Sequence, residues 1–184
     1  MLMRTSRSIP AAAVLLTVFA ALAPAADLPR KAPDFAIGMP GGKSLPLSQY
    51  KGKAVIVAFI LTYCSHCQNA TAVLSKLQPE YGPRGLQVVG SAVEPDAESH
   101  LALFVKNYAP AFPVGFNTQA VAGAFFQPTG KVPMMPLLAF IDKQGVIRDQ
   151  RQGDDDAFFG SLEQNLRKEI ESLLKPAAAK GSVH

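Results

Sequence analysis

The residues best suited to chemistry in this sequence are two cysteines three positions apart, Cys64 and Cys67, with His66 between them. The chain contains no other cysteine. A disulfide between the two would close a four-residue loop, which restricts the unfolded chain by only about 2 kcal/mol, against about 4.7 kcal/mol for a 100-residue loop. A structural zinc site needs four nitrogen or sulfur ligands, and the only further histidines are His100 and His184. A redox-active dithiol is the third interpretation, and it depends on the elements that position the pair.

A buried strand and a helix are predicted on the two sides of the cysteine pair. Residues 54–61 form a continuous apolar run rich in β-branched side chains, typical of a parallel strand buried on both faces. Apolar residues then recur at helical spacing, in a helix expected to end before Tyr81: Ala70, Val73, Leu74 and Leu77. The cysteines therefore lie at a strand-to-helix turn, where unpaired backbone N–H groups and the helix dipole stabilise a thiolate. Since the thiolate is the nucleophile of disulfide exchange, and a second thiol can resolve the mixed disulfide, this placement favours the redox interpretation.

The remaining pattern predicts an α/β domain in which helices alternate with buried strands, indicating βαβ units with right-handed crossovers. The expected elements are a hairpin over 35–45, a second buried strand over 86–93, a helix capped by Asp96 with Leu101, Phe104, Val105 and Tyr108 on one face, a short edge-like segment over 112–114, a helix from Thr118 to Phe126, a hairpin over 137–150, and a final helix that opens at 154–156 and carries an apolar stripe from Phe159 to Leu173.

Both ends of the chain are expected to lie outside the folded domain, which we place at residues 27–175. Residues 1–26 contain Arg4 and Arg7, an apolar stretch of about 13 residues, shorter than the roughly 20 that cross a bilayer, and an Ala-Pro-Ala cleavage site. We expect a secretory signal peptide, with an uncleaved membrane anchor as the alternative. Cleavage would leave a periplasmic or secreted protein without stable membrane insertion. Residues 176–184 are expected to form a disordered tail.

Composition is typical of a globular protein and gives no support to nucleic-acid binding. Of the 184 residues, 48% are apolar and 17% are charged, enough apolar surface to offset the entropy of ordering one domain. The formal net charge is only +4, and no block of five or six like charges occurs. We therefore expect no nucleic-acid partner.

The motifs resemble the thioredoxin fold and, within it, the redoxin (TlpA/ResA-like) branch of periplasmic thiol-disulfide oxidoreductases, which is related to the AhpC/TSA proteins. The matching stretches are Ala-Pro-Asp-Phe at 32–35, Gly-Lys at 52–53, Phe-x-x-Thr-Tyr-Cys-x-x-Cys at 59–67 and Pro-x-x-x-x-Ile-Asp-x-x-Gly at 136–145. The resemblance implies a three-layer sandwich with a central mixed β-sheet, an N-terminal β-hairpin extension and a long C-terminal helix. It also implies no cofactor beyond a redox-active disulfide.

The resemblance assigns roles to three residues of this chain. It implies that Cys64 is the exposed nucleophile, that Cys67 is the buried resolving thiol, and that Pro136 is a cis-proline facing the disulfide. The residue before the nucleophile is usually Trp in this family and is Tyr63 here. Protein thiols and disulfides are the implied partners, with apocytochrome c and a membrane thiol reductase as candidates.

Two further residues are candidates for the site, each with a simpler alternative. Ala58 replaces the buried acid of thioredoxin, and Glu94 resembles the acid that other members keep near the dithiol; a solvated loop carboxylate is an equal alternative. His66 lies beside the thiolate at the helix start, where a histidine stabilises the reduced form and makes the disulfide more oxidising. A solvent-facing role is the alternative for His66.

Two other functions compete with disulfide exchange. Peroxiredoxins share the Ala-Pro-Asp-Phe opening, but their Pro-x-x-x-Thr-x-x-Cys signature would require proline and threonine at the positions of Val57 and Leu61. A Cu(I) metallochaperone would combine the soft ligands of the cysteine pair and its histidine with Met134 or Met135. A methionine before a proline packs more often against an incoming peptide.

Overall fold

The computed structural model describes residues 27–128 and 133–175, so the expected signal segment and tail lie outside the described residues. The strands are β1 (Arg30–Lys31), β2 (Ala36–Met39), β3 (Lys43–Pro46), β4 (Ala54–Ile60), β5 (Leu86–Ala92), β6 (Val114–Phe116), β7 (Leu137–Ile141) and β8 (Val146–Gln152). The helices are α1 (Ser65–Tyr81), α2 (Ala97–Tyr108), α3 (Gln119–Phe126), α4 (Asp156–Phe159) and α5 (Leu162–Leu174), with short 3-10 turns at Leu47–Tyr50 and Gly82–Arg84. Within the described residues, none of these helices is long and apolar enough to cross a membrane.

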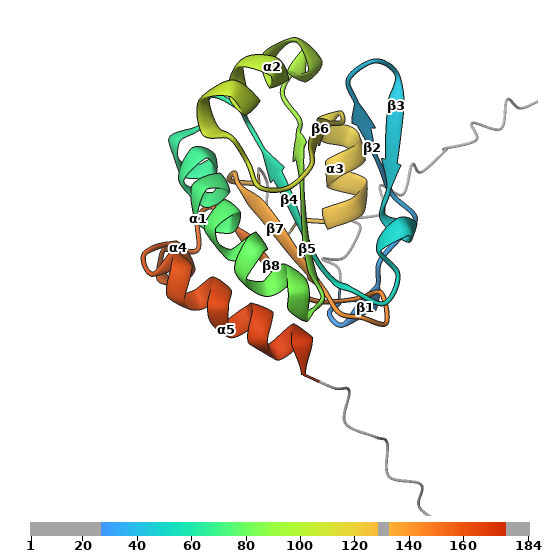
Figure 1. The fold of residues 1–184 in the computed structure, drawn as a ribbon, viewed down its shortest axis with the longest axis vertical. Coiled ribbons are helices and arrows are strands. Elements are labelled where there is room, and N and C mark those ends of the chain that lie inside the picture. The colour runs from blue at the N-terminus through green and yellow to red at the C-terminus, as the bar shows by residue number, and fades with distance from the viewer. Residues whose placement is uncertain (1–26, 129–132, 176–184) are drawn as a thin grey trace, which may run out of the picture.

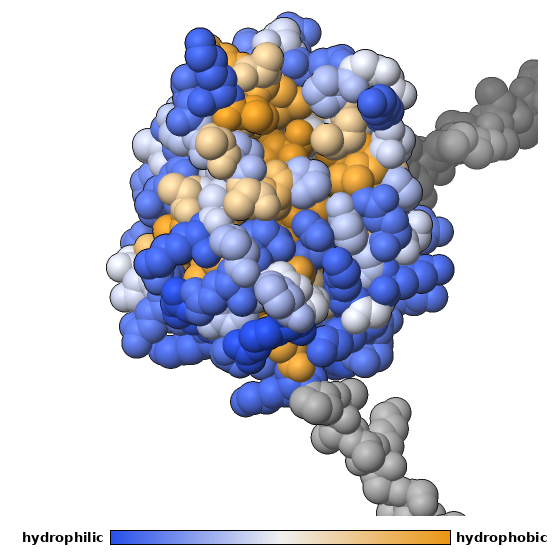
Figure 2. All heavy atoms as spheres, in the orientation of Figure 1, coloured by the Kyte–Doolittle hydropathy of each residue, from blue (hydrophilic) through white to orange (hydrophobic). Residues whose placement is uncertain are grey.

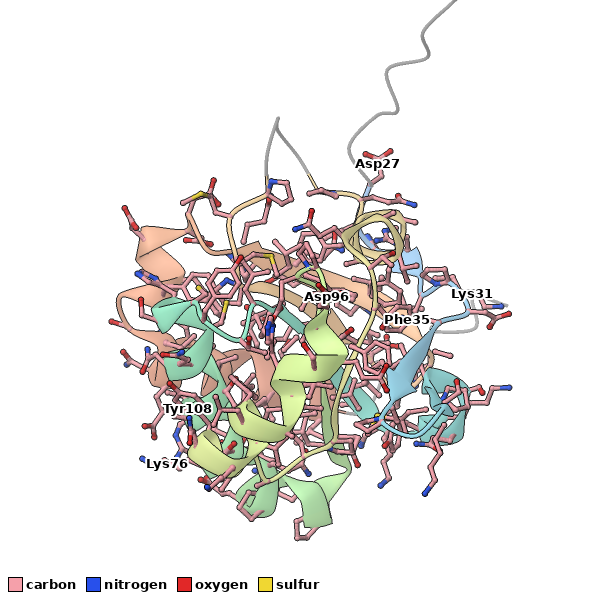
Figure 3. The ribbon with its side chains drawn as sticks, turned by 90° about the horizontal axis from the view of Figure 1, so that it is seen from above. Asp27, Lys31, Phe35, Lys76, Asp96 and Tyr108 are labelled. Carbon is pink, nitrogen blue, oxygen red and sulfur yellow. The ribbon has the colours of Figure 1, made fainter. Side chains whose placement is uncertain are left out.

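One mixed sheet runs through the molecule in the order β1-β8-β7-β4-β5-β6-β2-β3, with helices on both faces (Figure 1). Residues of α1, α2, α4 and α5 share a core with one face, and α3 packs on the other together with the N-terminal segment. Figure 1 shows α5 beside α1, and Figure 3 shows Phe35 pointing inward, where its ring meets that of Phe125. The mixed three-layer architecture, the N-terminal hairpin and the C-terminal helix are confirmed.

Strand β4 explains the continuous apolar run of the sequence, because every one of its residues is buried. Alternate side chains point to opposite faces of a strand. Accordingly, Ala54, Ile56, Ala58 and Ile60 belong to the core with α1, and Val55, Val57 and Phe59 belong to the core with α3.

The sheet brings four chain segments together at one edge. β4 and β5 are parallel, and so are β5 and β6, so their carboxyl ends point the same way. β7 runs antiparallel to β4, which places its amino end at that edge too. The segments at this edge are therefore 61–64, 93–96, 117–118 and 133–136.

The edge-like segment expected over 112–114 forms a strand at Val114–Phe116 (β6) instead, and the prediction that it lies at the outer edge of the sheet is wrong. It lies between β5 and β2, because Gly38 of the N-terminal hairpin pairs with Phe116. Gly115 permits this approach, since a Cβ there would strike the side chains of Ile37 and Met39 and the backbone of Gly38. The contact joins segments far apart in the chain, so no local pattern predicts it.

Helix boundaries also differ from the predicted ones. The expected final helix is interrupted at Gly160–Ser161 and forms α4 and α5, whereas α1 continues through Pro79 to Tyr81. Asp96 does precede α2, but it is left-handed (φ 56°, ψ 27°) and its side chain makes no cap. The N–H of Ser99 bonds the Asp96 backbone oxygen instead, at 2.9 Å.

The predicted apolar face of α2 is only partly buried. Leu101 and Phe104 are buried as expected, whereas Val105 is exposed and Tyr108 is half-buried. The helix therefore packs through a narrower stripe than the sequence pattern indicates.

Candidate redox site

Cys64 is the residue that caps α1. Its backbone is extended (φ −84°, ψ 121°), and its Sγ accepts a hydrogen bond from the backbone N–H of Cys67, with an N···S distance of 3.4 Å. The side chain is partly exposed. A sulfur in this position faces the free N–H groups and the positive end of the helix dipole, which favour negative charge.

Cys67 has a different environment, although it is only one turn further along the helix. It is fully buried, and its Sγ accepts a hydrogen bond from the N–H of Leu61 at 3.5 Å. Burial raises the pKa of the Cys67 thiol well above its ordinary value, and the hydrogen bond with Cys64 and the charge of Glu94 act in the same direction. Cys67 is therefore held as a neutral thiol behind the more accessible Cys64.

Glu94 is a buried carboxylate, which excludes the solvated-loop alternative. Its side chain is 1% exposed. Oε1 accepts hydrogen bonds from the hydroxyl of Thr62 and from its backbone N–H, the latter at 3.2 Å. Among the described residues Oε2 has no hydrogen-bond partner and is buried. Glu94 is thus tied to the segment that leads from β4 to Cys64.

His100 approaches the same carboxylate, and sequence reasoning did not include it in the site. It lies in α2, with Nδ1 3.6 Å from Oε1 of Glu94, and its side chain is 51% exposed. Thr62 was noted only as part of a motif. The sequence spacing of Thr62 and His100 does not by itself indicate a site. The one usable indication is that His100 follows Glu94 by six residues, on the helix after the strand that ends near Glu94.

Pro136 lies at the same edge of the sheet as the cysteine turn. The Met135–Pro136 peptide is cis, as the resemblance implies. Leu137, which follows it, is paired with Phe59 of β4. The segment before β7 is also hydrogen-bonded to the residue that follows β8, because the N–H of Gly153 donates to the carbonyl of Met134 at 2.7 Å.

His66 is exposed in the first turn of α1. Within the described residues it makes no hydrogen bond or ion pair, so the structure does not join it to either sulfur. Exposed apolar side chains also border this end of the molecule: Tyr63 is 69% exposed and Met134 is 55% exposed.

A groove opens next to Glu94, between the N-terminal ends of α2 and α3. It encloses about 970 Å³ and includes Val93, Asp96, Phe116 and Val121 in its lining. Figure 2 shows apolar side chains gathered over α2, β6 and α3 on this face. Figure 3 places Asp96 near the centre of the view from above.

No metal centre is evident at the cysteines. Across residues 27–128 and 133–175, no group of three or more His, Cys, Asp or Glu side chains is arranged to hold an ion.

A thioredoxin-type sheet with a Cys-x-x-Cys pair at a helix start defines a thiol-disulfide oxidoreductase, which uses its own cysteines as the redox group. The family model of the AhpC/TSA family matches residues 28–150, and the chain belongs to this family.

Named relatives and solved structures agree with this class. The chain is 29% identical over 144 residues to the thiol-disulfide oxidoreductase ResA of Bacillus thuringiensis subsp. konkukian, covering 77% of this chain and 78% of the relative. It is 26% identical over 125 residues to the thioredoxin-like protein YneN of Bacillus subtilis, covering 67% and 71%. A Chlorobium tepidum crystal structure assigned as a thiol:disulfide interchange protein DsbE superimposes with a TM-score of 0.64 at 27% identity, covering 78% of this chain and 98% of that one.

Proposed function

We propose that this oxidoreductase exchanges disulfides with extracytoplasmic protein partners, with Cys64 as the attacking sulfur and Cys67 as the resolving one. The observation that carries the proposal is the asymmetry of the pair. Cys64 is partly exposed at the positive end of α1, and Cys67 is buried behind it with a raised pKa. Only the first sulfur is accessible to a protein disulfide.

The reaction then has two displacement steps. The thiolate of Cys64 attacks one sulfur of the partner disulfide, and the other partner sulfur leaves as a thiolate. Cys67 next loses its proton and attacks the Cys64 sulfur, which releases the second partner sulfur as a thiolate. Cys64 and Cys67 are thereby oxidised to a disulfide and the partner is reduced by two electrons. The reverse sequence oxidises a partner dithiol.

Glu94 is the proposed proton acceptor for Cys67. A buried thiol needs a base before it can attack, because water does not reach it. Oε2 of Glu94 is buried and has no partner among the described residues, and the charge of this carboxylate raises the pKa of Cys67. Thr62 fixes the carboxylate through Oε1, which leaves Oε2 to take the proton.

Pro136 and His66 complete the proposed site. Pro136, at the edge next to the cysteine turn, aligns the backbone of an incoming partner, and the exposed side chains of Tyr63 and Met134 offer it apolar surface. His66, when protonated at the start of α1, stabilises the Cys64 thiolate and so makes the disulfide more oxidising.

The extracytoplasmic setting rests on the sequence of residues 1–26, which lie outside the described part of the chain. We propose that they are removed on export and that residues 27–175 form the exported domain. Intact-mass analysis of the protein from the extracytoplasmic fraction measures this directly. A mass that still includes residues 1–26 would indicate an anchored protein instead.

Trapping of mixed disulfides tests the proposed function. The Cys67→Ser variant keeps the attacking sulfur but cannot resolve the adduct, so covalent complexes with extracytoplasmic proteins should accumulate and disappear with dithiothreitol. The Cys64→Ser variant is the matched control and should trap nothing, because its remaining thiol is buried. Non-reducing gels followed by mass spectrometry identify the adducts and their linkage.

Two outcomes would contradict the assignment. Adducts with Cys64→Ser and none with Cys67→Ser would reverse the roles of the cysteines. Rapid hydrogen peroxide turnover by Cys67→Ser, without any protein adduct, would favour a thiol peroxidase. Val57, at the position of the peroxidase proline, is buried inside β4 in the core with α3.

A further inference from the structure

The proposed exchange leaves a proton in the interior of the protein. Cys67 is fully buried and the side chain of Glu94 is 1% exposed. A proton that passes from Cys67 to Glu94 must still reach solvent before the next cycle, and the reverse reaction needs one to enter. Glu94 borders the groove between α2 and α3, but its side chain has too little exposure to exchange that proton with bulk water by itself, and Cys67 has none.

His100 is the side chain that joins this interior carboxylate to the surface. Its Nδ1 lies 3.6 Å from Oε1 of Glu94, and half of its side chain faces solvent. Histidine is the side chain that ordinarily gains and loses a proton near neutral pH. His100 comes from helix α2, which lies beside α1 (Figure 1).

Among the described side chains that face Glu94, His100 is the one that can pass a proton on to solvent. From the segment after β4, Thr62 supplies a hydroxyl and an N–H, neither of which accepts a proton in this pH range. From α1, Cys67 is the donor itself. From α2 the resolved partner is His100, while the acids Asp96 and Glu98 near the start of that helix form no ion pair with it within the described residues.

We propose that His100 is a positioning residue that relays protons between Glu94 and solvent during disulfide exchange. The inference rests on the proposed function, in which Glu94 takes the proton of Cys67. In the resolving step the Cys67 proton moves to Glu94 as the S–S bond of the mixed disulfide is exchanged. The neutral carboxyl then rotates about its Cγ–Cδ bond, which exchanges the positions of its two oxygens and brings the proton beside Nδ1 of His100. The imidazole takes this proton, and the resulting imidazolium releases it to water. No electron passes through His100.

The two steps of exchange can be timed separately with 5,5′-dithiobis(2-nitrobenzoate). The attack of Cys64 on this disulfide releases one thionitrobenzoate, and the attack of Cys67 on the adduct releases a second. In stopped-flow measurements on the reduced protein, the first phase reports Cys64 and the second reports the resolving step. Cys67→Ser should give the first release only, which verifies the assignment of the phases.

His100→Gln should slow the second phase by about tenfold and leave the first unchanged, because only the resolving step needs proton transfer through Glu94. The relay also predicts a pH dependence of the second phase in the wild type that is absent from His100→Gln. The second phase should be slower still in Glu94→Gln. It should be equally slow in the double variant Glu94→Gln/His100→Gln, because both residues act on one proton-transfer route. Lys106→Gln removes a charge from the exposed face of the same helix and is the matched control.

Rescue separates a relay from a structural role. Imidazole added to His100→Ala should restore the second phase in proportion to its concentration. A second phase of wild-type rate and pH profile in His100→Gln would overturn the relay, and so would a slow phase that imidazole leaves unchanged. A normal rate in Glu94→Gln would remove the relay while leaving disulfide exchange intact. A single equivalent from the wild type, with no resolving phase, would instead contradict the proposed function itself.

Discussion

The two cysteines show how three positions along a chain create two chemically different thiols. Cys64 precedes the first turn of α1 and is partly exposed, whereas Cys67 points into the core that α1 shares with the sheet. The family resemblance implies this asymmetry, and the sequence pattern accounts for its setting, because a helix start follows a buried strand. The resemblance also names Glu94, but the sequence leaves open whether this carboxylate is buried, because Glu94 reaches the site through the register of β4 and β5.

The raised pKa of Cys67 predicts a pH dependence of stability. Unfolded Cys67 ionises near its usual pKa of about 8.5, whereas folded Cys67 stays protonated. The contribution to folding is fully present below the unfolded pKa, and it falls by about 1.4 kcal/mol per pH unit above it. We therefore expect Cys64→Ala to lose stability at alkaline pH faster than Cys64→Ala/Cys67→Ala. Urea unfolding of both variants across this range measures the difference, and parallel curves would show that burial does not shift the pKa.

At the scale of elements, the pattern of side chains predicts what is local. The apolar run of β4, the turn-separated strands β7 and β8, and the cap of α3 by Thr118 all follow from neighbouring residues. The place of β6 does not, because its neighbour β2 comes from the other end of the chain. The break between α4 and α5 at Gly160 is likewise invisible in an apolar stripe that continues through both helices.

The residue after strand β8 packs closely against the segment that carries Pro136 and so limits the position of its backbone. Gly153, directly after β8, lies so close to this segment that a Cβ would collide with the carbonyl of Met135. Gly153→Ala should displace the Met134–Pro136 backbone, lower stability by about 1–3 kcal/mol, and slow the reaction of Cys64 with a protein disulfide. Chemical unfolding and the rate of adduct formation measure the two effects.

A second glycine provides the matched control for this prediction. Gly123 lies in α3, where an added Cβ meets nothing within 4 Å. Gly123→Ala should therefore raise stability, by up to about 1 kcal/mol, and leave the adduct rate unchanged. If the Gly153 variant reacts with a protein disulfide as fast as the Gly123 variant does, the position of the Pro136 segment does not govern access to Cys64.

At the scale of the whole molecule, the helical layer of α1 and α5 holds the site rigidly to the sheet. Leu166 and Ile170 of α5 are fully buried, and Lys76 and Glu163 form an ion pair of 2.8 Å across the two helices. Exposed pairs of this kind contribute only about 0–1 kcal/mol, so the apolar contacts carry most of the attachment. The sequence predicts this layer from the stripe of α5, whereas the Thr62–Glu94–His100 cluster requires the assembled fold.

The glutathione equilibrium reports on both the couple and its tuning by His66. A positive charge at the start of α1 favours the thiolate, so His66→Ala should shift the equilibrium toward a more reducing potential, on the order of 30 mV for a tenfold change. Asn69→Ala, another exposed position of α1, is the control. Equal potentials for the wild type and His66→Ala would leave His66 as a solvent-facing residue.

The central claim is that Cys64 and Cys67 interconvert between a dithiol and a disulfide. Its most direct test is to equilibrate the purified protein with glutathione buffers of graded potential, quench with acid, alkylate, and count free thiols by mass spectrometry. The account predicts one two-electron transition in which both thiols disappear together, with the Cys64–Cys67 disulfide found by peptide mapping. Thiols that persist in the most oxidising buffer, or glutathione held on Cys64 without an internal disulfide, would contradict it.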